Sequence, residues 1–273
     1  MWQHMHAALC HRQGFLCVVP MKRKSEVMQA VKQFAKETLD AIICDAAKEK
    51  TSQNLRQFCH EIGTTLRVLE KGTPWANKAE FHIGHIKEAV RKDRKEADSP
   101  IVLWDYCVER RARINNVTAR NLFSLQGQNA HFTVTGEEGD ISNLCKFGWH
   151  DWCYFRDHNS FPMQREILGR VLGPAKGEGN EMSQWVLKAN GRVVPRHTCG
   201  PLTTAKSSST NEQSKRNEFD RLIKGRWGST INLPESNVPV STVTDDENEE
   251  DDFIEHEEDD ELPTVIPEID EKL

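Results

Sequence analysis

Short apolar runs alternate with helical patterns along the first part of the chain. The run Gly14–Val19 ends at Pro20 and predicts a strand, with a partner strand near His6–Cys10 across a turn. Apolar residues then recur at helical spacing over Ser25–Thr38. The later predicted elements are a strand at Ala41–Cys44, a helix that opens at Thr51 or Ser52 and runs to Ile62, a strand at Leu66–Leu69, and helices at Ala76–Ala97 and Ser99–Ile114. This order predicts a mixed α/β sheet with helices on its faces.

The pattern changes after Asp140, where short strands alternate with glycine-rich turns. Four such strands predict a small β-barrel, and they are Trp149–Phe155, Leu168–Leu172, Trp185–Leu187 and Val193–Arg196. The polar run Ser207–Thr210 predicts a linker, and a short basic helix follows over Lys215–Arg226. The predicted parts are an α/β core at 1–135, a barrel at 140–204, a linker with its helix at 205–234, and a disordered tail at 235–273.

Charge is distributed unevenly between the predicted folded part and the tail. Residues 235–273 carry 17 Asp/Glu and 1 Lys, a balance of −16. Residues 1–234 carry 35 Lys/Arg and 25 Asp/Glu, a balance of +10. The acidic tail outweighs this positive charge, so the net charge of the whole chain is −6. A basic folded part of this kind favours a polyanion such as DNA as its partner.

Hydropathy, apolar runs and cysteine spacing predict where in the cell the protein is located. Hydrophobic residues make up 37 % and mean hydropathy is −0.66, which is low for a chain folded throughout. No apolar run approaches the length of about 18 residues that spans a bilayer, and the first residues do not resemble a signal peptide. The 8 cysteines are scattered without a CxxC pair, which is typical of reduced thiols. We therefore expect an intracellular protein, nuclear or cytoplasmic, with no contact to a membrane.

Two carboxylates are candidates for metal-dependent chemistry. Asp45 follows the apolar strand Ala41–Cys44, and Glu80 lies 35 residues later in the first turn of a predicted helix. Phosphoryl transfer with Mg²⁺ needs carboxylates on rigid elements that meet at one edge of a sheet. The chain has 42 acidic residues, so the spacing alone is also met by a solvated Asp and an ordinary helix Glu.

The residues around this pair resemble the integrase core of copia-type retrotransposons. In that family the third catalytic carboxylate typically follows a Pro and an Asn, as Glu80 does after Pro74 and Asn77. The similarity covers roughly residues 14–230 in separate segments. These are Val18–Lys22, Gln29–Phe34, Ile43–Ala47, Gly72–Glu80, Ala89–Arg91, Tyr106–Asn116, Asp140–Leu144, Phe147–Trp149, Leu168–Pro174 and Gly191–Arg196.

The resemblance implies an RNase H-like fold, DNA integration as the activity, and three carboxylates that bind Mg²⁺ or Mn²⁺. Asp45 matches the second carboxylate and Glu80 the third. The first belongs to a strand upstream of the hairpin, and residues 1–25 contain no Asp or Glu. We expect a core that is truncated at its N-terminus, lacks the first strand, does not bind the metal productively and is catalytically impaired. No small-molecule cofactor is implied.

The helix that carries Glu80 also presents a candidate DNA-binding face. Glu80, Gly84, Lys87 and Arg91 share one side at helical spacing, and Lys78 begins the same turn as Glu80. The basic residues suit phosphate contacts, although an amphipathic helix with solvated lysines shows the same pattern.

Two other groups receive a structural interpretation. The arginines at 110, 111 and 113 are interpreted as a solvated helix face, and the tryptophans at 149, 152, 185 and 227 as packing residues rather than base-stacking platforms.

Three readings of the whole chain remain open. The first is a truncated integrase core that retains affinity for DNA. The second is a non-catalytic nucleic-acid-binding or assembly module, with a homo-oligomer as a possible form. The third is an unfolded pseudogene product, because loss of a central strand exposes the edge of its neighbour and removes core area.

Overall fold

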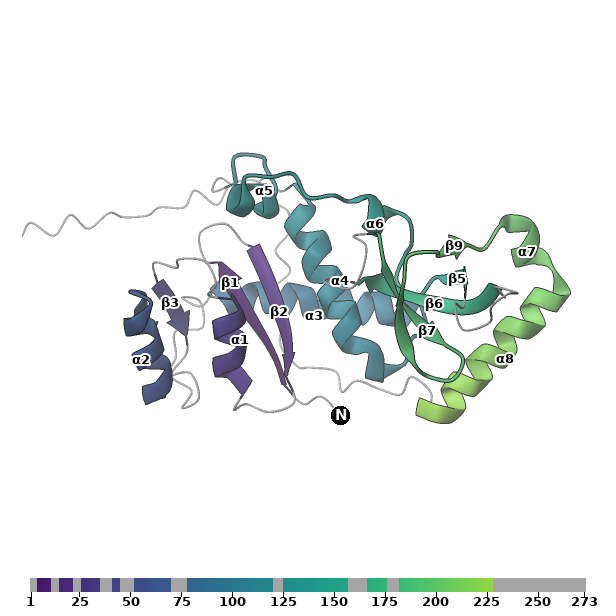
Figure 1. Ribbon diagram of the computed structural model, residues 1–273, viewed down its shortest axis with the longest axis horizontal. Helices are drawn as coiled ribbons and strands as arrows, with labels where there is room; N and C mark the ends of the chain where they lie inside the picture. The colour runs from purple at the N-terminus through teal and green to yellow at the C-terminus, as the bar shows by residue number, and fades with distance from the viewer. Residues whose placement is uncertain are drawn as a thin grey trace, which may run out of the picture. The chain divides into compact units, whose positions relative to one another are not determined.

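The computed structural model describes residues 4–10, 15–21, 26–34, 41–44, 52–69, 78–119, 125–156, 166–175 and 182–227. The chain divides into two compact units, residues 1–231 and residues 232–273, and every described residue belongs to the first unit. The predicted acidic tail therefore lies outside the described residues. The described part is a mixed α/β structure with antiparallel and parallel strand pairs (Figure 1).

The first described elements are a hairpin followed by a parallel strand pair. Strands β1 (His4–Cys10) and β2 (Phe15–Met21) pair antiparallel, and helix α1 spans Val27–Phe34. Strands β3 (Ala41–Cys44) and β4 (Thr65–Val68) pair parallel, with helix α2 (Gln53–Glu61) in the connection between them. Parallel strands need such a crossover, because a tight turn joins only antiparallel neighbours.

Two predictions for this region need correction. The strand predicted to end at Pro20 continues to Met21, with Pro20 opposite Met5. A proline fits here because β2 is an edge strand in its sheet, where a missing N–H donor is tolerated. The predicted single mixed sheet is also absent among the described strands. The hairpin and the parallel pair form two separate sheets, because no described strand joins them by hydrogen bonds.

Helix α2 shows how local sequence sets its boundaries. Of the two predicted starting residues, Ser52 is the N-cap, and its side chain accepts a hydrogen bond from the Leu55 backbone N–H at 3.4 Å. After its C-terminus the chain turns at Gly63 with φ of +69°, a conformation that glycine adopts without steric cost. Leu55 and Cys59 form its buried side at i, i+4 spacing.

Helices α3 (Lys78–Glu96) and α4 (Trp104–Val117) are joined by a short 3₁₀ turn, η4 (Ile101–Leu103). The predicted helix start at Ser99 is wrong. The Ser99 hydroxyl accepts a hydrogen bond from the indole N–H of Trp149 at 2.9 Å instead, and Ser99 is fully buried. A distant side chain thus competes for the oxygen that local sequence assigns to a helix cap.

Helix α4 contacts both the hairpin and the later sheet (Figure 1). One hydrophobic cluster joins these elements, so the core continues across the predicted boundary between residues 135 and 140. Its buried members are Leu16, Ile86, Val90, Leu103, Cys107, Val108, Ala112, Trp149, Leu172, Leu187, Phe219 and Ile223. The predicted division into parts at 1–135, 140–204 and 205–234 stays a prediction.

The later sheet has five antiparallel strands in the order β8-β7-β6-β5-β9. It follows two short helices, α5 (Ala130–Thr135) and α6 (Ser142–Cys145). The strands are β5 (Trp152–Arg156), β6 (Glu166–Pro174), β7 (Gln184–Lys188), β8 (Val193–Arg196) and β9 (Gly200–Pro201).

Each of these strands lies at or beside a predicted one, except β9, which the prediction omits. The predicted barrel is not closed by the described strands, because the edge strands β8 and β9 do not pair with each other. Both edge strands contain a proline, which cannot donate to a ladder.

Two helices follow the sheet, α7 (Thr204–Ser208) and α8 (Thr210–Trp227). The predicted linker over Ser207–Thr210 is therefore largely helical, and the predicted basic helix begins five residues earlier than expected. In the added turn the Glu212 carboxylate accepts a hydrogen bond from the Tyr154 hydroxyl of β5, and further along α8 Phe219 and Ile223 bury one side of the helix in the shared core. Within the described part of the chain, no helix has the length and apolar character needed to cross a membrane.

Candidate nucleic-acid interface

One candidate metal carboxylate follows a described strand, and the other lies on a described helix. Strand β3 ends at Cys44, so Asp45 comes directly after a strand with a parallel partner. Glu80 is the third residue of α3, as the sequence predicts. Asp45 itself lies outside the described residues, and so does the side chain of Glu80. Their meeting at one metal site stays a prediction.

The predicted basic side of helix α3 lies next to its buried side. Ile86 and Val90 are 5 % and 7 % exposed and belong to the shared core. Lys87 is exposed, and a Cβ at Gly84 would meet no atom within 4 Å, so this side of the helix is open. Lys78 begins the helix, but its side chain lies outside the described residues.

Arg91 lies on the same side and is half-buried. One of its guanidinium nitrogens is 3.5 Å from a carboxylate oxygen of Glu88, in an i,i+3 ion pair at the surface. Exposed pairs of this kind contribute only about 0–1 kcal/mol and are screened by salt. The ion pair with Glu88 therefore holds Arg91 only weakly.

The arginines of α4 do not form the solvated face that the sequence predicts. Arg111 makes a bidentate ion pair with the buried carboxylate of Asp93 on α3, and the hydrogen bonds raise the pKa of Arg111. Arg110 donates to the backbone carbonyl of Phe147 at 3.0 Å, and burial lowers its pKa. Burial also lowers the pKa of Arg113. All three are half-buried, and Arg110 and Arg111 join packed elements rather than face a polyanion.

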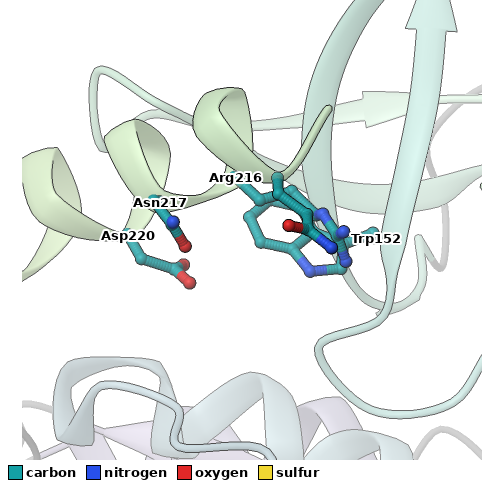
Figure 2. Close-up of a pocket in the computed structure, with 5 residues that line it drawn as sticks. Trp152, Arg216, Asn217 and Asp220 are labelled. Atoms are coloured by element: carbon teal, nitrogen blue, oxygen red, sulfur yellow. The ribbon is translucent and has the colours of Figure 1, made fainter. Parts of the chain in front are cut away.

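A second candidate site, which the sequence did not indicate, lies between β5 and α8. A cavity of about 240 Å³ opens beside Trp152 of β5 and residues along one side of α8 (Figure 2). Those residues are Gln213, Arg216, Asn217 and Asp220. In the sequence, only their i, i+3, i+4, i+7 spacing indicates that these residues share one side of a helix. The same spacing occurs on one side of any helix, so it does not indicate a binding site.

The tryptophans of this region do act as packing residues, as predicted. Trp149 is 7 % exposed within the shared core, and the other three pack against it partly buried. Trp152 meets Phe219 edge to face with ring centroids 5.2 Å apart, and the Arg170 guanidinium lies 3.4 Å from its ring centroid. Trp152 combines this packing role with a place in the wall of the cavity.

Among the described residues, His, Cys, Asp and Glu side chains form no group of three that could hold a metal ion. The carboxylates of Asp45 and Glu80 are hard oxygen donors of the kind that Mg²⁺ prefers.

Comparison with known proteins gives little further information. Neither the protein-family models nor the curated proteins include a match to this chain. Among solved structures, the chain is similar to one from the simian T-cell lymphotropic virus intasome in complex with PP2A regulatory subunit B56 gamma. The TM-score is 0.38 at 12 % sequence identity, over 73 % of this chain and 74 % of that chain. A similarity this low supports no conclusion about function.

Proposed function

We propose that this chain is an integrase-type core of the copia class whose retained activity is binding to DNA. The observation that carries the proposal is which described elements hold or precede the candidate residues. Glu80 is the third residue of α3, Asp45 directly follows β3, and the side of α3 that continues from Glu80 carries Lys87 and Arg91. The sequence segments that resemble the family surround each of these positions.

The two separate strand pairs are compatible with this reading. The resemblance calls for one mixed sheet with a central first strand. The described strands include an antiparallel hairpin, β1–β2, and a parallel pair, β3–β4, and both forms occur in such a sheet.

Asp45 and Glu80 would hold the metal ion, and Mg²⁺ would supply charge stabilisation for a phosphoryl transfer when bound. Residues 1–273 provide two of the three carboxylates that the resemblance calls for. We therefore propose that this chain alone binds a divalent cation weakly and does not join DNA ends. Mn²⁺ binding followed by electron paramagnetic resonance tests the first point, with Asp45→Asn and Glu80→Gln expected to lower the affinity and Glu88→Gln on the same helix as the control.

Incubation of the purified chain with a labelled donor duplex, a plasmid target and Mg²⁺ tests the second point. The expected result is that no joined product forms. Joining that is lost in Glu80→Gln would contradict the proposed loss of activity and support the full integrase function.

DNA binding is tested by fluorescence anisotropy of a labelled duplex over a range of salt concentrations. Each phosphate contact contributes roughly −0.9 to the slope of log affinity against log salt. The double variant Lys87→Ala/Arg91→Ala should reduce the steepness of that slope by about 2. Lys92→Ala, which removes an exposed lysine from another side of α3, should leave it nearly unchanged. Equal effects of the two variants would contradict the proposed interface.

The second function class, a non-catalytic nucleic-acid-binding module, is favoured by one observation. The cavity beside Trp152 lies on elements remote in sequence from Asp45 and Glu80, so a nucleic-acid contact there needs no catalytic metal.

A further inference from the structure

The cavity between β5 and α8 offers an unusual combination of groups. Trp152 contributes an indole, Gln213 and Asn217 contribute carboxamides, and Arg216 contributes a cation (Figure 2). Gln213 and Asn217 are exposed, and neither carboxamide hydrogen-bonds another residue in the described part of the chain. Each carboxamide therefore has both a donor and an acceptor available to a ligand.

Trp152 is held in the cavity wall by the contacts of a neighbouring arginine, Arg170. Arg170 donates to both carboxylate oxygens of Asp220, at 3.0 and 3.1 Å, and to the backbone carbonyl of His150 at 2.9 Å. Its side chain is only 14 % exposed and lies over the Trp152 ring. The ion pair thus neutralises Asp220 while the guanidinium fixes the orientation of the indole.

The cation in the cavity is held in place as well. Arg216 donates to the backbone carbonyl of Ser207 at 2.7 Å and to that of Glu212 at 3.4 Å. These contacts are to neutral carbonyls, so the positive charge of Arg216 is not cancelled by them. Because Asp220 is paired with Arg170, the cavity presents one net positive charge beside an aromatic ring and two carboxamides.

Together these groups match one nucleotide. Drug-sized ligands occupy pockets of about 300–1,000 Å³, and a cavity of about 240 Å³ suits a smaller planar group such as a single base. A simple anion would use Arg216 alone and leave the indole and both carboxamides without a role. Bases that are unpaired can lie against aromatic rings, and carboxamides can read their donor and acceptor edges.

We propose that this cavity binds one unpaired nucleotide of single-stranded DNA. The base lies against Trp152, Gln213 and Asn217 hydrogen-bond its edge, and Arg216 contacts the adjoining phosphate. The proposal rests on the proposed DNA-binding function and extends it, since it adds a site for an unpaired strand at a distance along the chain from the duplex contacts assigned to α3.

The test compares two fluorescent 12-nucleotide strands of equal charge, one of thymidines and one of abasic residues. Base–aromatic stacking is worth roughly a five- to hundredfold gain in affinity for each base. The full-length chain should therefore bind the thymidine strand at least about fivefold more tightly than the abasic strand. The double variant Gln213→Ala/Asn217→Ala should weaken binding of the thymidine strand and leave binding of the abasic strand unchanged, because it removes the hydrogen bonds to the base edge while Trp152 still stacks on the base. Both residues are exposed, so the change does not disturb the core, whereas replacement of Trp152 would.

Asn211→Ala is the matched control, because it removes an exposed carboxamide from the opposite side of α8. A second measurement locates the base. A strand carrying 5-iododeoxyuridine, irradiated on the protein and digested, should crosslink in the peptide that contains Trp152.

Equal affinity for the thymidine and abasic strands, a loss in Asn211→Ala as large as in the double variant, or crosslinks only in other peptides would each overturn the proposal. Failure of the proposed function has a different signature. In that case the duplex does not bind at low salt or its binding does not depend on Lys87, whatever the single strands do.

Discussion

Asn116 of α4 hydrogen-bonds the backbone of Leu16 on the hairpin strand β2. Its replacement tests whether these hydrogen bonds hold the hairpin against α4. The Asn116 side chain accepts a hydrogen bond from the Leu16 backbone N–H at 2.8 Å and donates one to the Leu16 carbonyl at 2.7 Å. Both residues are buried, at 5 % and 2 % exposure. The Asn116 carboxamide on α4 therefore hydrogen-bonds the N–H and the carbonyl of Leu16 on β2, as the backbone of a neighbouring strand would.

Asn116→Ala would leave two buried backbone groups without a partner. A buried polar group that loses its partner costs about 1–3 kcal/mol, so the variant should lower the free energy of unfolding by about 2–6 kcal/mol. That is a large share of the roughly 5–15 kcal/mol that stabilises a typical domain. Urea unfolding of the full chain measures the change, and hydrogen exchange at the Leu16 amide should lose its protection.

Asn115→Ala provides a matched control at the adjacent position. The amide nitrogen of Asn115 is buried and makes no hydrogen bond within the described residues, so its removal should cost much less. If the two variants destabilise the chain equally, or if the Leu16 amide stays protected in Asn116→Ala, the reasoning is refuted.

Three further predictions concern buried groups and one exposed thiol. Burial lowers the pKa of His150 to about 3, so the folded chain keeps it neutral while the unfolded chain protonates it below pH 6.5. Stability should therefore fall with pH between 6.5 and 3, by up to about 1.4 kcal/mol per pH unit from this group, and urea titrations of His150→Asn should show a flatter dependence. Asparagine tolerates the φ of +62° found there. Iodoacetamide should label the exposed Cys145 long before Cys107, whose pKa burial raises to about 12, and peptide mapping that finds the reverse order would contradict the burial described. Ser99→Ala removes the acceptor of the Trp149 indole N–H and should destabilise the chain by about 1–3 kcal/mol in the same urea assay; no change would mean that the hydrogen bond is not needed.

The candidate site was predictable only in part. The position of Glu80 in the first turn of α3 and the exposure of Lys87 follow from local sequence, and the structure has both. The cavity beside Trp152 could not be predicted, because it needs β5 and α8 side by side, and these lie about 60 residues apart in the chain. The pairing of Asp45 with Glu80 depends on residues outside the described part and stays a prediction.

The sequence by itself determined the elements whose signals are local. The strands Ala41–Cys44 and Val193–Arg196 have the predicted boundaries. An apolar or β-branched run between turn residues is a local signal, so it predicts a strand before its partner strand is known. Ser52 caps α2 for a similar reason, since its hydroxyl serves an amide three residues away.

Tertiary structure alone decided which partners several polar side chains bind. Ser99 binds Trp149 instead of capping a helix, Arg111 pairs with Asp93 instead of facing solvent, and Asn116 substitutes for a strand. The physical reason is common to these cases. A polar group that becomes buried must find a partner, and that partner is set by which elements pack together rather than by neighbours in sequence.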